Sequence, residues 1–499
     1  MRKHLRMKQI TKASADRPSE RPAAGAAAGT TLRRLIFLCA ALIASGCTMI
    51  PKYDRPPATV AAQYPGASQT NETDAADIAW QTFFADERLK RLIEVALTNN
   101  LDLRVAVLNV EQSRAQYRIT RSASFPTVDG SGSYTRSQSS LGGFPQAGGG
   151  PAGASTFTSS LWSASLGTTS YELDLFGHVR SLNRQALEKY FATAEAKRDA
   201  QITLVSEVAT EYFTLRQAGE QLQLAQQTLK AVQESYDINK ATFDAGASSQ
   251  LDVSTADGQL QTAKINVLTY QRQLAQAENY LVLLIGQPLP AELPAPQPFN
   301  STNLLAETPA GLPSELVQRR PDILEAEHTL KAANANIGAA RSAFFPTITL
   351  TASAGSASSQ LAQLFGPGTG VWSFAPQVTL PIFTGGQNRA ELDSAKVATR
   401  IEVADYQKAI QTAFREVADA LVAISTYADQ IHAESAAINA EQVRYDLSNL
   451  RYRQGEDTYL NVLLAQQDLY SAQQGMLQAQ YNKIASQISL YQALGGGWK

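Results

Sequence analysis

The chain has few of the residues that perform catalysis or bind metals. Its 499 residues include 2 cysteines, 4 histidines and 4 methionines. Three of the histidines, His178, His328 and His432, lie beyond the N-terminal region, and they show no ligand spacing. No nucleophile, base and orienting group can be assembled from them. We therefore expect solvated histidines, no metal, no cofactor and no enzymatic activity.

Charge of one sign and long hydrophobic runs are also missing. The formal net charge is −2 and charged residues make up 18% of the chain, so no basic patch predicts nucleic-acid binding. The longest apolar run, from Leu35 to Ala44, has about ten residues, whereas a membrane-spanning helix needs roughly 20. This run follows Arg33 and Arg34 and precedes small residues, which predicts a secretory signal peptide over residues 1–46.

The four residues Ala44-Ser45-Gly46-Cys47 resemble the lipobox of bacterial lipoproteins, in which the cysteine is acylated and becomes the first mature residue. Ala44 departs from the usual Leu, Val or Ile. Since Cys39 lies inside the signal, the mature chain keeps one cysteine and cannot form an internal disulfide. Residues 47–76, which contain several prolines, are expected to form an acylated, extended tether. An ordinary signal peptide with an incidental cysteine is the alternative.

Glutamine, alanine and leucine dominate the middle and end of the chain, a composition typical of long helices. The segment from Val179 to Phe243 contains no proline and a single glycine, Gly219. At 1.5 Å per residue it would form a rod of roughly 100 Å. Between Ile410 and Ile431, apolar residues recur in steps of four and three, which predicts side-by-side, coiled-coil-like packing.

The chain contains two copies of one helical-hairpin pattern, 209 positions apart (445 − 236). The matching pairs are Tyr236 and Tyr445, Phe243 and Tyr452, Gly246 and Gly455, Leu251 and Leu460, and Val253 and Val462. We predict two long αα-hairpins, at residues 177–285 and 384–499. Shorter helices near residues 101–124 and 248–285, stacked end to end, would match one long rod in length.

Two Phe-Pro-Thr sequences, at Phe125 and Phe345, end helical segments, and after each the apolar period changes to two. They predict β-hairpins at residues 125–176 and 345–383, each with one polar and one apolar face. The remaining segments, residues 77–124 and 286–344, are expected to hold the other helices and a proline-rich linker.

Four strands with one apolar face form an open sheet with two exposed edges, and a membrane tolerates only a closed barrel. Two chains would give a filled barrel of about 8 strands, and three would give about 12 strands with a lumen, so we predict a homotrimer. Tyr134, Trp162 and Trp372 lie near the expected strand ends, as in outer-membrane barrels. A soluble β-sandwich packed on helices is the alternative.

The order of elements, Cys47, the two Phe-Pro-Thr stops, the run Leu380-Pro381-Ile382-Phe383, and RYRQGEDTYLNVLLAQQDLYSAQ followed by ALGGGW at the C-terminus together resemble one family. This is the TolC-like outer-membrane efflux channel family, specifically its lipoprotein subgroup (NodT/OprM-like), which serves resistance-nodulation-division tripartite systems. The resemblance covers essentially the whole mature chain.

The resemblance implies an α+β membrane protein in the cell outer membrane: a trimeric 12-stranded β-barrel continued by a long α-helical barrel across the periplasm. It implies a passive export conduit for drugs or other small toxic compounds, lipid-anchored among outer-membrane lipids. The implied partners are a periplasmic adaptor and an inner-membrane resistance-nodulation-division transporter, which supplies the energy.

The resemblance also places a periplasmic gate at the hairpin turns. Asp252 and Asp457 match aperture aspartates of related channels, and Arg451, Arg453 and Gly455 complete the second turn. The alternative is structural: Asp457 stands where a helix N-cap is wanted, and the two arginines stand at a helix C-terminus, where cations are favoured.

Two positions that are acidic in the general secretion channel of the family are Asn461 and Leu464 here, so the aperture would be built differently. An outer-membrane channel for type I protein secretion and a periplasmic coiled-coil adaptor are the remaining alternatives. Only Met49 and Met476 remain in the mature chain as soft thioether ligands, which favours organic compounds over copper or silver as cargo.

Overall fold

The computed structural model describes residues 48–61, 64, 78–140, 156–299, 305 and 319–498. Cys47 and the expected signal peptide lie outside this part of the chain, as does much of the expected tether. The elements, in chain order, are α2 (Trp80–Phe83), α3 (Glu87–Asn99), α4 (Leu101–Ser122), β1 (Asp129–Ser140), β2 (Thr156–Glu172), α5 (His178–Asp244), α6 (Gln250–Ile285), α8 (Pro321–Ser342), β3 (Thr347–Ser358), η2 (Leu361–Gln363), β4 (Gly370–Thr379), α9 (Gln387–Arg453) and α10 (Tyr459–Ala493).

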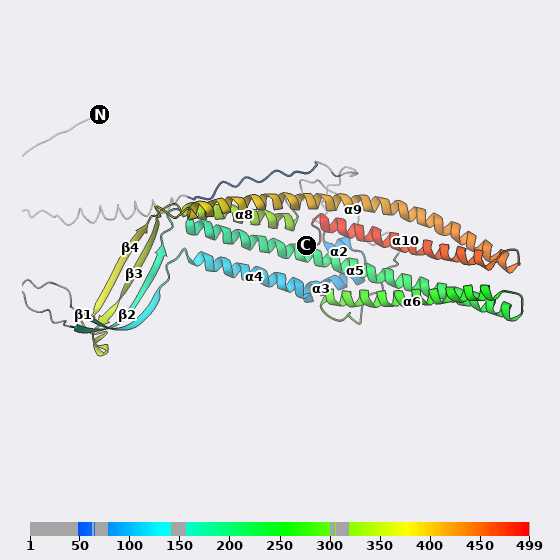
Figure 1. Cartoon of the computed structure of the whole chain (residues 1–499), viewed down its shortest axis with the longest axis horizontal. Coiled ribbons are helices and arrows are strands. Elements are labelled where there is room, and N and C mark those ends of the chain that lie inside the picture. Colours follow the sequence, from blue (N-terminus) through cyan, green and yellow to red (C-terminus); the bar gives the residue numbers. More distant parts are fainter. Residues whose placement is uncertain are drawn as a thin grey trace, which may run out of the picture.

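A four-stranded sheet occupies one end of an elongated molecule, and the helices run away from it side by side (Figure 1). The turns between α5 and α6 and between α9 and α10 lie together at the far end. No helix in the described part of the chain is long and apolar enough to cross a membrane.

Two helices of 67 residues, α5 and α9, stand where the sequence predicts rods, and their first residues are 209 positions apart (387 − 178). Each follows a glycine with a left-handed backbone, Gly177 (φ 78°) and Gly386 (φ 90°). Glycine adopts this conformation without the steric cost of a side chain, so the chain can turn sharply from the sheet into each rod.

The shorter helices stack end to end beside the rods, α4 with α6 and α8 with α10 (Figure 1). At each junction, the residue that precedes the helix nearer the sheet, α4 or α8, donates a hydrogen bond to the end of the other helix. Asn100 Nδ2 donates to the carbonyl oxygen of Leu284 near the end of α6 (2.9 Å), and Arg320 Nη1 donates to that of Ala493 at the end of α10 (2.8 Å). Asn100 and Arg320 therefore satisfy carbonyl groups that a helix terminus leaves unpaired.

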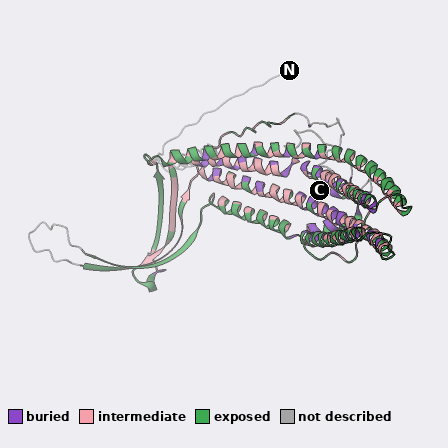
Figure 2. Ribbon diagram, turned by 45° about the vertical axis from the view of Figure 1, so that its right-hand side comes forward, coloured by how far each residue is buried: buried purple, intermediate pink, exposed green. Residues whose placement is uncertain are grey.

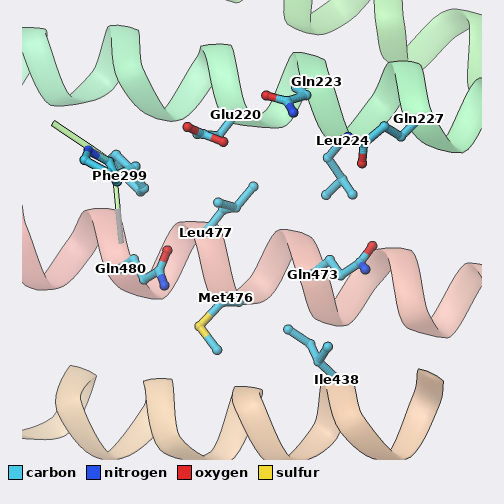
Figure 3. A pocket seen from close by; sticks show the side chains of 11 residues that line it. Glu220, Gln223, Leu224, Gln227, Phe299, Ile438, Gln473, Met476, Leu477 and Gln480 are labelled. Carbon is cyan, nitrogen blue, oxygen red and sulfur yellow. The ribbon is translucent and has the colours of Figure 1, made fainter. Parts of the chain in front are cut away.

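The largest core lies at mid-length, where α2 and α3 pack on α5, α6 and α10. Figure 2 shows that buried residues lie on several helices along the bundle, whereas the sheet is exposed or intermediate. Phe83 stacks on Tyr491 with ring centroids 4.0 Å apart. Tyr212 donates to Asp86 Oδ2 (2.7 Å), and the Asp86 side chain also caps α3. Through this core, α10 of the second hairpin packs against α5 and α6 of the first hairpin.

All neighbouring strands of the sheet are antiparallel, in the order β1-β2-β3-β4. One row across the four strands consists of Gly130, Leu166, Ala354 and Trp372, on the apolar face. The opposite face carries serine pairs, such as Ser133 and Ser163, whose Oγ atoms are 2.7 Å apart. The sheet thus has the two-faced pattern that the alternation predicts.

The expectation that the three aromatic residues lie near strand ends is wrong for two of them. Trp372 lies near the start of β4, but Tyr134 and Trp162 face each other inside β1 and β2, with ring centroids 4.3 Å apart. The next pair on the same face is Arg136 and Ser160. Tyr134 and Trp162 therefore mark the end of the apolar face, and the two strands continue past it.

Of the three histidines expected to be solvated, His432 is exposed, whereas the side chains of His178 and His328 are 38% and 23% exposed and each pairs with a glutamate. His328 Nδ1 lies 2.7 Å from Oε2 of Glu188, a buried residue on α5 that also pairs with Arg184 (2.6 Å). Burial acts to raise the pKa of Glu188, but the hydrogen bond from His328 and the charge of Arg184 outweigh it and lower this pKa. A hydrogen bond to Glu172 raises the pKa of His178. No group of side chains in the described part of the chain has the geometry of a metal site.

Candidate gate at the hairpin turns

The two hairpin turns have the same backbone structure. Gly246 (φ 76°) and Gly455 (φ 75°) end their helices in the left-handed conformation. The amide of Ala247 donates to the carbonyl of Thr242 (2.9 Å), and the amide of Glu456 donates to that of Arg451 (3.0 Å). These are the bonds of a Schellman motif, which accounts for glycine at both positions.

Asp252 lies in the first turn of α6 and caps that helix. Its Oδ2 accepts from the amide of Ser249 (3.1 Å) and from the Ser249 hydroxyl (2.7 Å), while the Asp252 amide donates to Ser249 Oγ (3.2 Å). This reciprocal pair is a capping box. The structure therefore gives Asp252 a local role in helix formation.

Asp457 lies just before Thr458, which is the N-cap of α10. Its Oδ1 accepts from Asn461 Nδ2 (2.6 Å) and from the amide of Thr458 (2.8 Å), and its Oδ2 lies 3.4 Å from Arg451 Nε. The hydrogen bond from Asn461, then that from Thr458 and the charge of Arg451, lower the pKa of Asp457. Asp457 is thus an ionised carboxylate that ties the end of α9 to the start of α10.

The two arginines of the turn differ in their contacts. Arg451 bridges the turn to Asp457, whereas Arg453 Nε donates to Asn449 Oδ1 on its own helix (3.3 Å). Of the five residues predicted for the gate, the structure brings Arg451, Gly455 and Asp457 together in one turn. Asp252 belongs to the other hairpin.

Sequence analysis missed the contact that joins the two hairpin ends. Tyr452 of α9 donates to Asn239 Oδ1 of α5 (3.1 Å), and its ring packs against Tyr459 (centroids 5.5 Å apart). A small core of Ala256, Tyr459, Val462 and Leu463 lies beneath. Burial raises the pKa of Tyr452, and the charge of Asp252 adds to this. The tyrosines of the repeated pattern were the available signal.

A four-stranded sheet with one apolar and one polar face, joined to rods of 67 residues that end in capped turns, defines a class of protein: a channel-forming outer-membrane protein with a long helical extension. Residues 92–287 and 312–496 match the family model described as "Outer membrane efflux protein". The chain belongs to this family, and it is the outer-membrane channel component of an efflux system.

Relatives and solved structures agree. The chain is 47% identical over 465 residues to the toluene efflux pump outer membrane protein TtgC of Pseudomonas putida, covering 92% of this chain and 94% of that protein. It is 40% identical over 471 residues to the cation efflux system protein CusC of Escherichia coli, covering 93% and 99%. The open-state structure of the Neisseria gonorrhoeae MtrE outer membrane channel matches with a TM-score of 0.81 and 41% identity, over 91% of this chain and 99% of that one.

Proposed function

We propose that three copies of the chain close into a 12-stranded outer-membrane barrel continued by a helical barrel, and that this trimer is the passive exit duct of a tripartite efflux pump. Within the described chain, the outer edges of β1 and β4 pair with no other strand. In α4 no residue is buried, and the exposed apolar residues on it are Leu101, Val105, Val107, Leu108 and Ile119. Neighbouring copies would cover these edges and this face.

The apolar face of the sheet has the height of a bilayer core. It runs from the row of Tyr134, Trp162 and Ser358 to the pair of Ile348 and Val378. Ten residue steps along β3 correspond to about 34 Å, which is about 24 Å along the membrane normal for strands tilted by about 45°. Outer-membrane barrels carry an apolar band of about 25 Å. This match is the observation that carries the membrane assignment.

The paired lengths of the helices support an internal duplication, as do the paired glycines at 177 and 386 and at 246 and 455. In a trimer the two hairpins of each chain would form a ring of six. A 67-residue helix spans about 100 Å, so the hairpin turns lie far into the periplasm. There a periplasmic adaptor would bind and connect the channel to an inner-membrane resistance-nodulation-division transporter, the source of energy.

The relatives at 47% identity carry names of toluene, solvent and antibiotic efflux pumps, which supports small organic toxicants as cargo and efflux over type I protein secretion. The amphipathic four-stranded sheet favours a channel over a coiled-coil adaptor. The scarcity of methionine supports organic cargo over soft metal ions.

The gate of this channel is the ring of hairpin turns, with Arg451, Gly455 and Asp457 on one hairpin of each chain and Asp252 on the other. Three Asp457 carboxylates around the axis would attract cations and repel one another. Replacing Asp457 with Ala breaks the tie to Arg451 and should raise single-channel conductance or antibiotic leak while trimers persist. Glu456→Gln, which removes a charge from the same turn, is the control. Unchanged conductance and ion selectivity in Asp457→Ala would contradict the gating role.

Acylation of Cys47 would anchor the chain at the membrane end of the helices. The carbonyl oxygen of Met49 accepts from Arg341 Nη1 in the last turn of α8 (3.3 Å), and Ile50 packs against Gly338. Two residues of chain reach about 7 Å at most, so an acyl group on Cys47 would lie beside the sheet. Cys47→Ser should abolish palmitate labelling of the purified protein. Labelling that persists would disprove the lipobox assignment.

A further inference from the structure

In the segment Leu380–Phe383, between β4 and α9, large apolar side chains are unusually exposed. Leu380 is 53% exposed, Ile382 92% and Phe383 90%. Positions 380 and 382 continue the alternation of Trp372, Phe374 and Val378 on the apolar face of β4. A soluble surface rarely leaves a contiguous apolar patch uncovered. The apolar face of the barrel thus extends past the last paired strand residue toward the helices.

The equivalent segment of the first half, 209 positions earlier, is closed by internal contacts. Asp174 stands at the position of Phe383 (383 − 209), and its Oδ2 accepts from the amide of Arg180 (2.8 Å) and from Arg180 Nε (3.1 Å). Phe176 stacks on Phe345 with ring centroids 4.9 Å apart. The first segment places a paired aspartate where the second has an exposed phenylalanine, so only the second leaves this position apolar and open.

Arg389 is the counterpart of Arg180 (389 − 209) and is the third residue of α9. A cation in the first turn of a helix opposes the helix dipole, and Arg180 offsets this with Asp174. Arg389 is exposed, and no carboxylate of the described residues forms an ion pair with it. The nearest acids along α9 are already engaged: Glu391 accepts from Gln387 (2.8 Å), and Asp393 pairs with Lys396 (3.4 Å). The positive charge of Arg389 is therefore available to bind an external anion.

We propose that Leu380, Ile382 and Phe383 insert into the periplasmic leaflet of the outer membrane, and that Arg389 binds the phosphate of a phospholipid headgroup there. The proposal rests on the outer-membrane placement of the barrel. Two observations favour lipid as the occupant: the segment is continuous with the apolar face of β4, and an exposed arginine lies in the first turn of the helix that follows it. An arginine at this depth matches the phosphate layer below the hydrocarbon core. The segment acts as an insertion loop that sets the depth of the channel in the membrane.

Spin labels test the insertion. The acylated trimer is reconstituted into vesicles of phosphatidylethanolamine and phosphatidylglycerol, with a single introduced cysteine at Ile382, at Phe374 on the strand surface, or at Leu251, 74% exposed at the hairpin turns. The label at 382 should be relaxed by oxygen, which partitions into lipid, and shielded from a water-soluble nickel chelate. The label at 251 should show the opposite.

Each contrary result has its own meaning. A label at 382 that is open to the nickel chelate, while the label at 374 is in lipid, overturns the insertion loop and leaves the barrel intact. A label at 382 that neither agent reaches shows that a second copy covers the segment, which also overturns the proposal. If the label at 374 is in water, the membrane placement itself fails.

Phosphatidylglycerol binding to the purified trimer tests the role of the arginine. A lipid contact of about 1 kcal/mol per arginine corresponds to about fivefold in affinity, so Arg389→Gln should weaken binding about fivefold. Phe383→Asp recreates the Asp174 arrangement and should weaken it similarly, because the new carboxylate occupies Arg389. Arg415→Gln, which removes an exposed arginine paired with Asp419 farther along α9, is the control. Unchanged affinity in Arg389→Gln would overturn the headgroup contact.

Discussion

Replacing Arg320 with Ala should destabilise the junction between α8 and α10 more than Asn100→Ala destabilises the matching junction between α4 and α6. Arg320 is 8% exposed. Its Nε and Nη2 donate to the two carboxylate oxygens of Asp322 (2.9 and 2.6 Å), and its Nη1 donates to Glu416 (2.8 Å) and to the Ala493 carbonyl (2.8 Å). These contacts hold its pKa above the ordinary arginine value despite the opposing effect of burial.

The magnitude follows from what the substitution leaves behind. Removing one partner of a fully buried ion pair costs about 3–5 kcal/mol, but the side chains of Asp322 and Glu416 are 32% and 37% exposed, so solvent screens the charges that Arg320→Ala leaves behind and the cost is smaller. At the α4–α6 junction, Asn100→Ala removes the bond to Leu284 and the cap on the Leu103 amide (2.8 Å). A lost cap costs about 1 kcal/mol and a lost buried hydrogen bond about 1–2 kcal/mol. Arg320→Ala removes four hydrogen bonds, three of them between charged groups, and should therefore exceed Asn100→Ala by about 1 kcal/mol per chain.

Urea unfolding of the purified trimer measures both variants under one protocol. Arg320→Met, which keeps much of the side-chain volume, separates the lost charge from lost packing and should resemble Arg320→Ala. An Arg320→Ala variant no less stable than Asn100→Ala at neutral pH would refute the electrostatic account of the junction.

Two further substitutions probe carboxylates with shifted pKa values. Burial, with the nearby charge of Asp322, raises the pKa of Asp199. The ionised form of Asp199 thus lowers the stability of the folded chain at neutral pH, and this cost disappears when Asp199 is protonated. Asp199→Asn should therefore stabilise the trimer at pH 7 and have little effect at pH 4. Equal effects at both pH values would refute this account. Glu327 is buried, and Arg55 (2.6 Å) and Lys331 (3.0 Å) overcome the effect of burial and lower its pKa, which fastens the N-terminal segment to α8. Glu327→Gln, which also weakens the bond from Tyr53, should speed tryptic cleavage after Lys52, with Glu325→Gln as the matched control, and unchanged cleavage would show that other contacts hold the segment.

The long helices and their turns could be predicted because their signals are local. A proline-free run, apolar steps of four and three, and a glycine at each end are all contained in the segment that folds. The strand faces followed from alternation in the same way. The aromatic rows were misplaced because residues 135–140 are all polar, so the sequence shows where the apolar face ends but not that the strand continues to Ser140.

Contacts between distant segments were not predictable in this way. The partner of His328 is Glu188, which lies 140 positions away on another helix. Arg320 marks a helix start in the sequence, but its bond to Ala493 depends on the stacking of two helices 173 positions apart. The prolines of the N-terminal segment predicted an extended chain, but not that Tyr64 would stack on Phe414 (centroids 5.1 Å apart). Such contacts exist only once the fold has brought the elements together.

Strands β1 and β2 continue beyond the point where β2 stops pairing with β3. The register of β2 with β3 ends at Trp162 and Ser358, while β1 and β2 stay paired to Ser140 and Thr156. Among the described residues, these two strands pair only with each other beyond Trp162. In the proposed barrel, the length and composition of this ribbon would be free to drift without altering the register of the strands that form the wall. The ribbon would stand at the outer face of the cell, where the chain would vary most under pressure from antibodies or phages while the proposed duct beneath it stays unchanged.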